Sequence, residues 1–314
     1  IGKMSIFFRI NNNKLFSAGE VNRLGFKKSD GLFIPDEYLN RQEFTIMRTC
    51  HGIGDWILLS AMPRLLKEKY PKCKVYLPSK KLLENIFGNM LRNWGYGTFD
   101  AADVVKNIFL NNPHVDKFVD SVDGEIYHDH FKIYDEQNDK IPLLNQMLKF
   151  WQFNDDEITD TTPDFYPTED EITWFKTFNN FNEYGYILAS SSFENGDPVE
   201  NLFSVINQYR GKIKNWYYYG EVEFNKSLFN SLKLKNVIEI KPLNLTIRQQ
   251  QLLKVKANVN FGNETGMSLW TSKYSKSYVL GHTKYTAIHG KEFEGKTRKN
   301  PFSSGNFIKG VIYL

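Results

Sequence analysis

Short apolar segments alternate with amphipathic segments of helical period along most of the chain, and this alternation constrains the fold more than any other feature. The first series starts at Phe44 and runs through "FTIMRT", "DWILLSAMPRLLKEKY" and "KVYLP". The second starts at "YGYILASSS" and continues to "SYVLG". Strands separated by helices of this length predict parallel sheets built from right-handed crossover units. The expected fold class is therefore α/β.

The length of 314 residues favours two cores, because single domains hold roughly 150 residues. The acidic, proline-containing stretch "NDDEITDTTPDFYPTEDE" separates the two series and is the expected linker, with Thr168 and Glu171 as a capping box for the next helix. Upstream, "SIFFRI", "NNNK" and "LFSAG" predict a hairpin. We therefore expect a β-rich extension over 1–43 and two doubly wound, Rossmann-like domains over 44–160 and 161–314, facing each other across a cleft.

The composition excludes several classes of protein. Hydrophobic residues make up 41% of the chain and aromatic residues 15%, which predicts packed cores. The 40 basic and 36 acidic residues are too balanced for a nucleic-acid binder. Two cysteines without metal-ligand spacing support neither a disulfide framework nor a zinc site. No apolar run reaches the roughly 18 residues of a membrane span, so we expect a cytoplasmic protein, with peripheral contact at the inner membrane surface as an alternative.

The stretch "HGIGDWILL" places Gly52, Gly54 and Asp55 where a strand ends and a helix begins. Glycines at such a turn allow a tight reversal and close approach of a ligand to the backbone. Asp55 would then point from the start of the helix into the cleft. The alternative is that Asp55 is only the N-cap of its own helix. Pro63 predicts a kink or an early stop further along this helix.

Two later stretches also carry polar residues from the end of a strand. In "NFGNETGMSLW", Thr265 and the N–H groups of Gly266, Met267 and Ser268 suit a phosphate, and Glu264 suits a sugar hydroxyl. The alternative is a helix cap formed by Thr265 or Asn263. In "ILASSSFENGDP", the hydroxyls of Ser190, Ser191 and Ser192 suit a diphosphate, and an ordinary loop is the alternative.

Three further features each have a simpler explanation. Lys284 is the candidate cation for a diphosphate, with Arg48 behind it, although a solvated lysine is the simpler interpretation. His128 and His130 share one side of a strand, but a metal site would need further ligands. The aromatic run "NWYYYG" could stack a base and is better explained as a buried strand.

Taken together, these stretches resemble glycosyltransferase family 9, the heptosyltransferases of lipopolysaccharide assembly. The resemblance rests on "GIGDWILLSAMPRLLKEKYP", on "NNPHVDKFVD" at 111–120, and on "NETGMSLWTSKYSKSYVLGHT". It covers residues 44–285 and is best at the two ends. It implies a GT-B arrangement of two Rossmann-like domains, with the acceptor bound mainly by the first and the nucleotide-sugar donor mainly by the second.

The resemblance implies an inverting transferase with no metal or other cofactor, using a nucleoside-diphosphate sugar as co-substrate and a glycan, lipid-linked glycan or protein as acceptor. The chain has no Asp-x-Asp motif that would hold a metal. Asp55 is the expected general base, with Ser190, Ser191, Thr265, Gly266 and Lys284 around the leaving diphosphate.

The chain departs from the family pattern at three points. The loop 190–198 lacks the family's lysine, Glu264 stands for an aspartate, and the histidine usual near Leu269 is absent. Two alternative functions therefore stay open. One is a nucleotide-sugar epimerase or hydrolase that uses His282 or Glu264 as a proton donor, and the other is a non-catalytic protein that binds nucleotide sugars.

Overall fold

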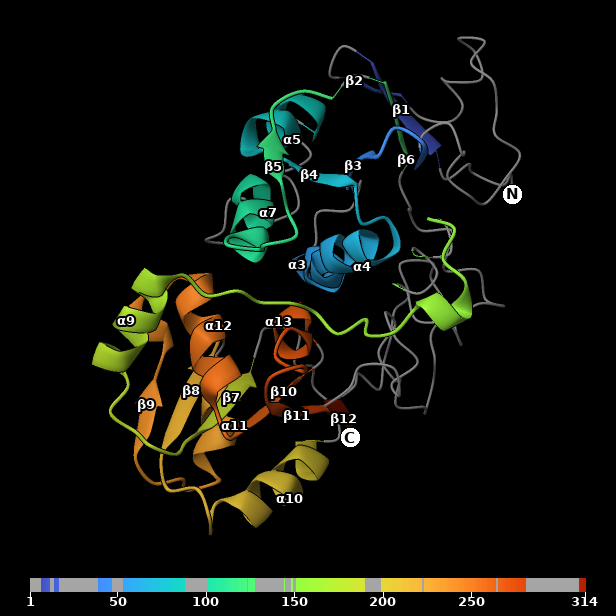
Figure 1. Cartoon of the computed structure of the whole chain (residues 1–314). Coiled ribbons are helices and arrows are strands. Elements are labelled where there is room, and N and C mark those ends of the chain that lie inside the picture. Colours follow the sequence, from blue (N-terminus) through green and yellow to red (C-terminus); the bar gives the residue numbers. More distant parts are fainter. Residues whose placement is uncertain are drawn as a thin grey trace, which may run out of the picture. The chain divides into compact units, whose positions relative to one another are not determined.

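The computed structural model describes residues 7–11, 14–16, 39–46, 53–87, 101–122, 124–127, 144, 148, 151–189, 199–221, 223–263, 265–280 and 311–314. The chain divides into two compact units, an N-terminal unit of residues 1–161 and a C-terminal unit of residues 162–314. Each contains a parallel sheet with helical connections, so the expected α/β class is confirmed (Figure 1).

The C-terminal unit is built on a six-stranded sheet in the order β12-β11-β10-β7-β8-β9, in which every neighbouring pair is parallel. The strand order reverses between β7 and β10, because β8 and β9 follow on one side and β11 and β12 on the other. This is the doubly wound order of dinucleotide-binding folds. Its strands are β7 (Gly185–Ala189), β8 (Trp216–Gly220), β9 (Val237–Glu239), β10 (Val259–Asn263), β11 (Lys276–Leu280) and β12 (Val311–Tyr313).

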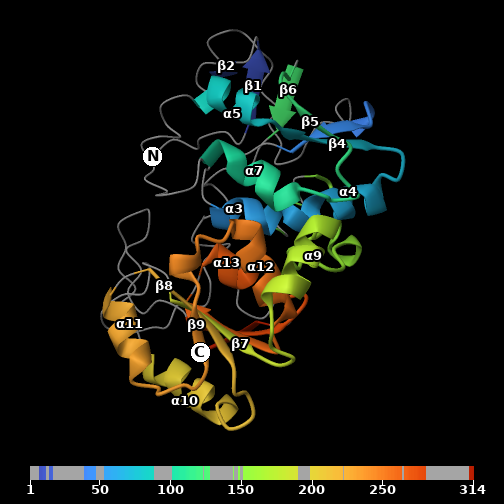
Figure 2. The same ribbon diagram turned by 90° about the vertical axis from the view of Figure 1, so that its left-hand side faces the viewer.

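Helices cover both faces of this sheet, as Figures 1 and 2 show. Ile187 and Phe261 face one way and pack with Leu202, Ile206 and Phe229 of α10 and α11. Tyr184, Tyr186 and Leu188 face the other way and pack with residues of α9, α12 and α13. The helices are α9 (Glu169–Phe178), α10 (Val199–Tyr209), α11 (Glu223–Asn230), α12 (Ile247–Lys256) and α13 (Gly266–Leu269).

Local sequence explains most of these elements. All five residues of β7 are buried, as expected of a central parallel strand. The run "NWYYYG" is confirmed as a buried strand, β8, because its residues alternate between the two cores. Helix α9 begins with the predicted capping box, in which Thr168 and Glu171 each accept a hydrogen bond from the other's backbone N–H.

The N-terminal unit contains a three-stranded parallel sheet in the order β3-β4-β5. Within the described part of this unit the three strands follow chain order, so the reversal expected of a doubly wound sheet is seen in the C-terminal unit alone. The expected helix from Asp55 to Tyr70 is interrupted by a 3-10 turn just before Pro63. The elements are β3 (Glu43–Thr45), α3 (Ile53–Leu58), the 3-10 turn (Leu59–Ala61), α4 (Met62–Lys69), β4 (Lys74–Pro78), α5 (Lys80–Phe87), α7 (Ala101–Phe109) and β5 (Lys117–Val119).

A second sheet in this unit is antiparallel. Strands β1 (Phe7–Asn11) and β2 (Lys14–Phe16) form the predicted hairpin, and β6 (Gly124–Tyr127) pairs with β1. The segment "EIYHDHF" therefore contributes its described residues to this sheet instead of extending the parallel one. None of the helices in the described part of the chain has the length and apolarity needed to cross a bilayer.

Candidate functional site

The most informative site in the C-terminal unit lies where β7 and β10 run side by side. Leu188 of β7 is paired with Gly262 of β10, one residue before each strand ends. Because the strand order reverses between these two strands, their connections leave in opposite directions. Ligands of open parallel sheets bind in the crevice outside the carboxyl ends of the strands at such a switch point. The structure therefore directs two predicted segments, one after Ala189 and one after Asn263, to one edge of the sheet.

The turn after β10 is tightly built. Thr265 is the N-cap of α13, since its hydroxyl oxygen accepts a hydrogen bond from the Ser268 N–H at 3.2 Å. The Ser268 hydroxyl donates to the Asn263 carbonyl at 2.8 Å and lies 3.2 Å from the Thr265 hydroxyl. Because the single hydroxyl hydrogen of Ser268 is used, Thr265 is the donor in that last contact. The capping alternative for Thr265 is thus confirmed.

Gly262 is needed where β10 approaches β7. A Cβ atom at this position would lie 2.8 Å from the Leu188 carbonyl oxygen and 3.0 Å from the Ser268 Oγ. Real Cβ atoms essentially never approach a backbone oxygen so closely. The glycine therefore permits the close packing of strand and turn that brings the two segments to one edge.

The structure describes only part of the predicted site. Gly266 opens α13 and Met267 is its second residue, half-buried against the core that contains Tyr186. Gly54 lies in α3. The following predicted residues lie outside the described part of the chain: Arg48, Gly52, His128, His130, Ser190, Ser191, Ser192, Glu264, His282 and Lys284.

Asp55 is the third residue of α3, a helix that begins at Ile53. It therefore lies in the first helical turn and is not the N-cap of this helix. The neighbouring Trp56 is 2% exposed, and its ring meets that of Phe109 edge-on at 6.4 Å. Packing of Trp56 against α7 thus fixes the start of α3, while the side chain of Asp55 lies outside the described part.

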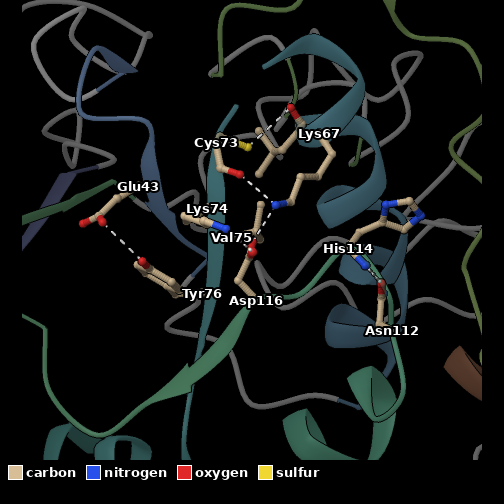
Figure 3. A network of polar contacts seen from close by, with 10 residues as sticks. Glu43, Lys67, Cys73, Lys74, Val75, Tyr76, Asn112, His114 and Asp116 are labelled. Carbon is tan, nitrogen blue, oxygen red and sulfur yellow. Dashed lines mark hydrogen bonds and ion pairs between the residues drawn. The ribbon is translucent and has the colours of Figure 1, made fainter. Parts of the chain in front are cut away.

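The stretch "NNPHVDKFVD" forms a polar network in the N-terminal unit (Figure 3). Asp116 accepts hydrogen bonds from Lys67 Nζ at 2.6 Å, the Val75 N–H at 2.8 Å and Lys74 Nζ at 3.2 Å. Lys67 Nζ also donates to the Cys73 carbonyl at 2.7 Å. Asn112 is buried, and its side-chain oxygen accepts from the His114 N–H. These contacts tie the turn before β5 to β4 and α4.

The network lies at the amino ends of the parallel strands, since Asp116 directly precedes β5 and Lys74 opens β4. Ligands of parallel sheets bind at the opposite, carboxyl ends. Burial acts to raise the pKa of Asp116, but hydrogen bonds from Lys67, Val75 and Lys74 hold it below its ordinary value. We therefore assign this motif to stability and not to chemistry.

Asp116→Asn is expected to destabilise the protein by about 1–3 kcal/mol, because it removes a charged acceptor from two lysines. A carboxyl with a depressed pKa contributes stability above its ordinary pKa, and this contribution is lost as the pH falls through the folded-state value. The deficit in urea unfolding should therefore be large at pH 7 and shrink below pH 4. Asp120→Asn is the matched control, because Asp120 is exposed and lies 3.9 Å from Lys81. Equal stability of both variants would contradict this role.

Helix α12 buries three polar side chains that its sequence does not mark as buried. Arg248, Gln251 and Lys254 recur every three residues and are 3%, 0% and 1% exposed. Arg248 makes a two-pronged contact with Glu171, with Nε–Oε1 and Nη2–Oε2 distances of 2.6 and 2.9 Å, and also donates to the Tyr166 carbonyl. Lys254 Nζ donates to the Met267 carbonyl. The helix is therefore polar toward α9 and α13.

Metal ligation finds no support in the described residues, where no group of three or more His, Cys, Asp or Glu side chains is placed to hold an ion.

Comparisons with known proteins give structural matches only. No protein-family model and no curated protein matches the chain. It is similar to a solved structure of a glycosyl transferase family 9 protein from Veillonella parvula DSM 2008, with 12% identity over 87% of this chain and 86% of that one and a TM-score of 0.48. It is also similar to ADP-heptose lps heptosyltransferase II from E. coli, with 12% identity over 86% and 90% of the two chains and a TM-score of 0.44.

Proposed function

We propose that the chain is a metal-independent inverting glycosyltransferase that moves a sugar, a heptose or hexose, from a nucleoside-diphosphate sugar to a hydroxyl acceptor on a glycan, lipid or protein. The observation that carries the proposal is the switch point of the C-terminal sheet. There the serine-rich segment after β7 and the Asn-Glu-Thr-Gly segment after β10 leave adjacent parallel strands. The resemblance of three sequence stretches to glycosyltransferase family 9 supports the type of reaction.

In this proposal the nucleotide diphosphate binds at the β7–β10 edge. Ser190, Ser191 and Ser192 supply hydroxyl and amide donors from one strand end. Gly266 and Met267 supply backbone from the other, because the Thr265 hydroxyl is already used within its turn. We assign Glu264 to a sugar hydroxyl and Lys284 to the diphosphate charge.

Chemistry then requires a base for the acceptor. We assign this role to Asp55, which would accept the proton of the acceptor hydroxyl while its oxygen forms a bond to the anomeric carbon. The bond from that carbon to the phosphate oxygen breaks on the opposite face, so the configuration inverts. The nucleoside diphosphate leaves with the bonding electron pair, and the donors at the β7–β10 edge stabilise its added negative charge.

A thermal-shift screen against ADP, GDP, UDP, CMP and their sugar conjugates tests the donor assignment. A ligand that binds only the native state raises the unfolding temperature, and about 100-fold excess over Kd adds about 2.7 kcal/mol of stability. We expect one nucleoside diphosphate and its sugar conjugate to raise the unfolding temperature by several degrees. No shift with any member of the panel would contradict the proposal. Conversion of the sugar nucleotide without any acceptor would instead indicate an epimerase or hydrolase.

A further inference from the structure

Lys254 is a fully buried lysine that the proposed mechanism does not use. It is 1% exposed, and its Nζ donates to the Met267 carbonyl and lies 5.9 Å from the centre of the Tyr186 ring. Among the residues that the structure describes, no carboxylate pairs with it. Burial lowers the pKa of Lys254 to about 7, so its side chain gains or loses a proton near neutral pH. A charge buried in this way is expensive and calls for a functional explanation.

The surroundings of Lys254 contain no compensating negative group in the described part of the chain. Tyr184 and Tyr186 on β7 both have pKa values raised far above the ordinary range by burial and therefore stay neutral. On the elements packed against α12, the carboxylate of Glu171 binds Arg248, and that of Asp164 binds Lys273 at 2.5 Å. Glu264 lies in sequence between β10 and α13 and is outside the described residues.

Polar atoms beside Lys254 also lack partners among the described residues. These are the Tyr186 hydroxyl, both side-chain amide atoms of Gln251 and the Asn260 Oδ1. Gln251 precedes Lys254 by one helical turn, and Asn260 Nδ2 donates to the Lys254 carbonyl at 2.9 Å. The layer between α12 and the sheet thus holds one cation and several polar atoms without hydrogen-bond partners among the described residues. In such a low-dielectric layer a nearby charge changes the energy of the cation strongly.

Lys254 contacts three elements of the C-terminal unit. Its backbone carbonyl accepts a hydrogen bond from Asn260 of β10, and its ammonium group donates to the carbonyl of Met267, the second residue of α13. The ammonium group also lies over the Tyr186 ring of β7. Met267 is the second residue of α13, whose N-cap is Thr265. The contact therefore holds the start of α13 against α12.

We propose that Lys254 is a positioning residue for the start of α13, residues 265–267, which it holds through the Met267 carbonyl, and that its positive charge favours an anionic diphosphate bound there. The second part rests on the proposed function. An anion brought near a buried cation stabilises the protonated form, so ligand binding and protonation of Lys254 must be linked.

Three variants separate the two parts. Lys254→Met removes both charge and donor, whereas Lys254→Gln removes the charge and keeps an N–H donor for the Met267 carbonyl. Lys256→Met is the matched control, because Lys256 is an exposed lysine on the same helix.

The charge is tested by calorimetric titration with ADP, GDP, UDP and inorganic pyrophosphate between pH 6 and 9. We expect both Lys254 variants to bind the preferred diphosphate about tenfold more weakly than the unmodified protein at pH 6, and this ratio to approach one at pH 9. Comparing variants at each pH removes the titration of the ligand itself. Lys256→Met should match the unmodified protein throughout. A ratio of one at pH 6, or a ratio that does not change with pH, would overturn the role of the charge.

The positioning role is tested without ligand, by hydrogen exchange of the amides in 263–270. We expect exchange there to be faster in Lys254→Met and close to the unmodified rate in Lys254→Gln and Lys256→Met. Unchanged exchange in Lys254→Met would overturn the positioning role. If no diphosphate binds the unmodified protein, the proposed function and the charge role both fail, while the exchange data still decide the positioning role.

Discussion

Asp55→Asn is expected to lower the rate of sugar transfer by about 10²–10⁴-fold, the contribution typical of a general base. The affinity for the nucleoside diphosphate should stay within about twofold, because we assign that ligand to the C-terminal unit. Asparagine keeps the size of the side chain and its place in the first turn of α3, so the fold should be unaffected. Single-turnover transfer and equilibrium binding, measured on the same preparation, separate the two effects.

Asp103→Asn provides the control for this variant. Asp103 also lies in the first turn of a helix in the N-terminal unit, and it forms a half-exposed ion pair with Lys80 at 3.2 Å. We expect its transfer rate to equal that of the unmodified protein. Unchanged turnover in Asp55→Asn would remove Asp55 from the mechanism, and loss of nucleotide binding in the same variant would reassign it to the donor.

Arg248→Met is expected to destabilise the protein by about 3–5 kcal/mol, the cost of leaving one partner of a buried ion pair alone. Arg248 is 3% exposed, contacts both carboxylate oxygens of Glu171, and lies with its guanidinium carbon 4.8 Å from the centre of the Phe165 ring. Its loss therefore also loosens the segment that leads into α9. Urea unfolding at pH 7 measures the effect.

A double-mutant cycle with Glu171→Gln distinguishes the ion pair from simple packing. We expect the double variant to be clearly more stable than the sum of the two single effects predicts, because the second change removes the charge left unpaired by the first. Burial acts to raise the pKa of Glu171, but hydrogen bonds from Arg248 and Thr168 hold it below the ordinary value of 4.5. The contribution of the pair is thus complete above pH 4.5 and is lost as the pH falls through the lower folded-state pKa. Additive effects, or a loss under 1 kcal/mol in Arg248→Met, would contradict this account.

The sequence predicted most elements because their patterns are local. The buried run of β7, the alternating aromatics of β8 and the capping box of α9 each carry their own signal. Helix α7 was missed although it carries such a signal, since Val104 and Ile108 lie one turn apart and are both buried. Strand order was not predictable, because pairing of β7 with β10 depends on which of several similar apolar strands meet in space.

Of the candidate site, the sequence predicted only that polar residues follow the ends of two strands, β7 and β10. Helix α13 is a single turn of four residues that begins after the N-cap Thr265, and a further turn follows at Trp270. Burial of Arg248 and Lys254 was not predictable, since charged residues at helical spacing normally face solvent. Arg248 pairs with Glu171, which is far away in the sequence, and Lys254 binds a backbone carbonyl, which a pattern of side chains does not reveal.

The central claim is that a nucleoside diphosphate binds at the β7–β10 edge of the C-terminal sheet. Hydrogen exchange of the whole chain, with and without a saturating concentration of the nucleoside diphosphate that raises the unfolding temperature most, tests this directly. We predict slower exchange in peptides that cover 187–192 and 262–268, and unchanged exchange in 112–120, where Asp116 has a structural role. Protection confined to other segments, or no protection at all, would contradict the claim.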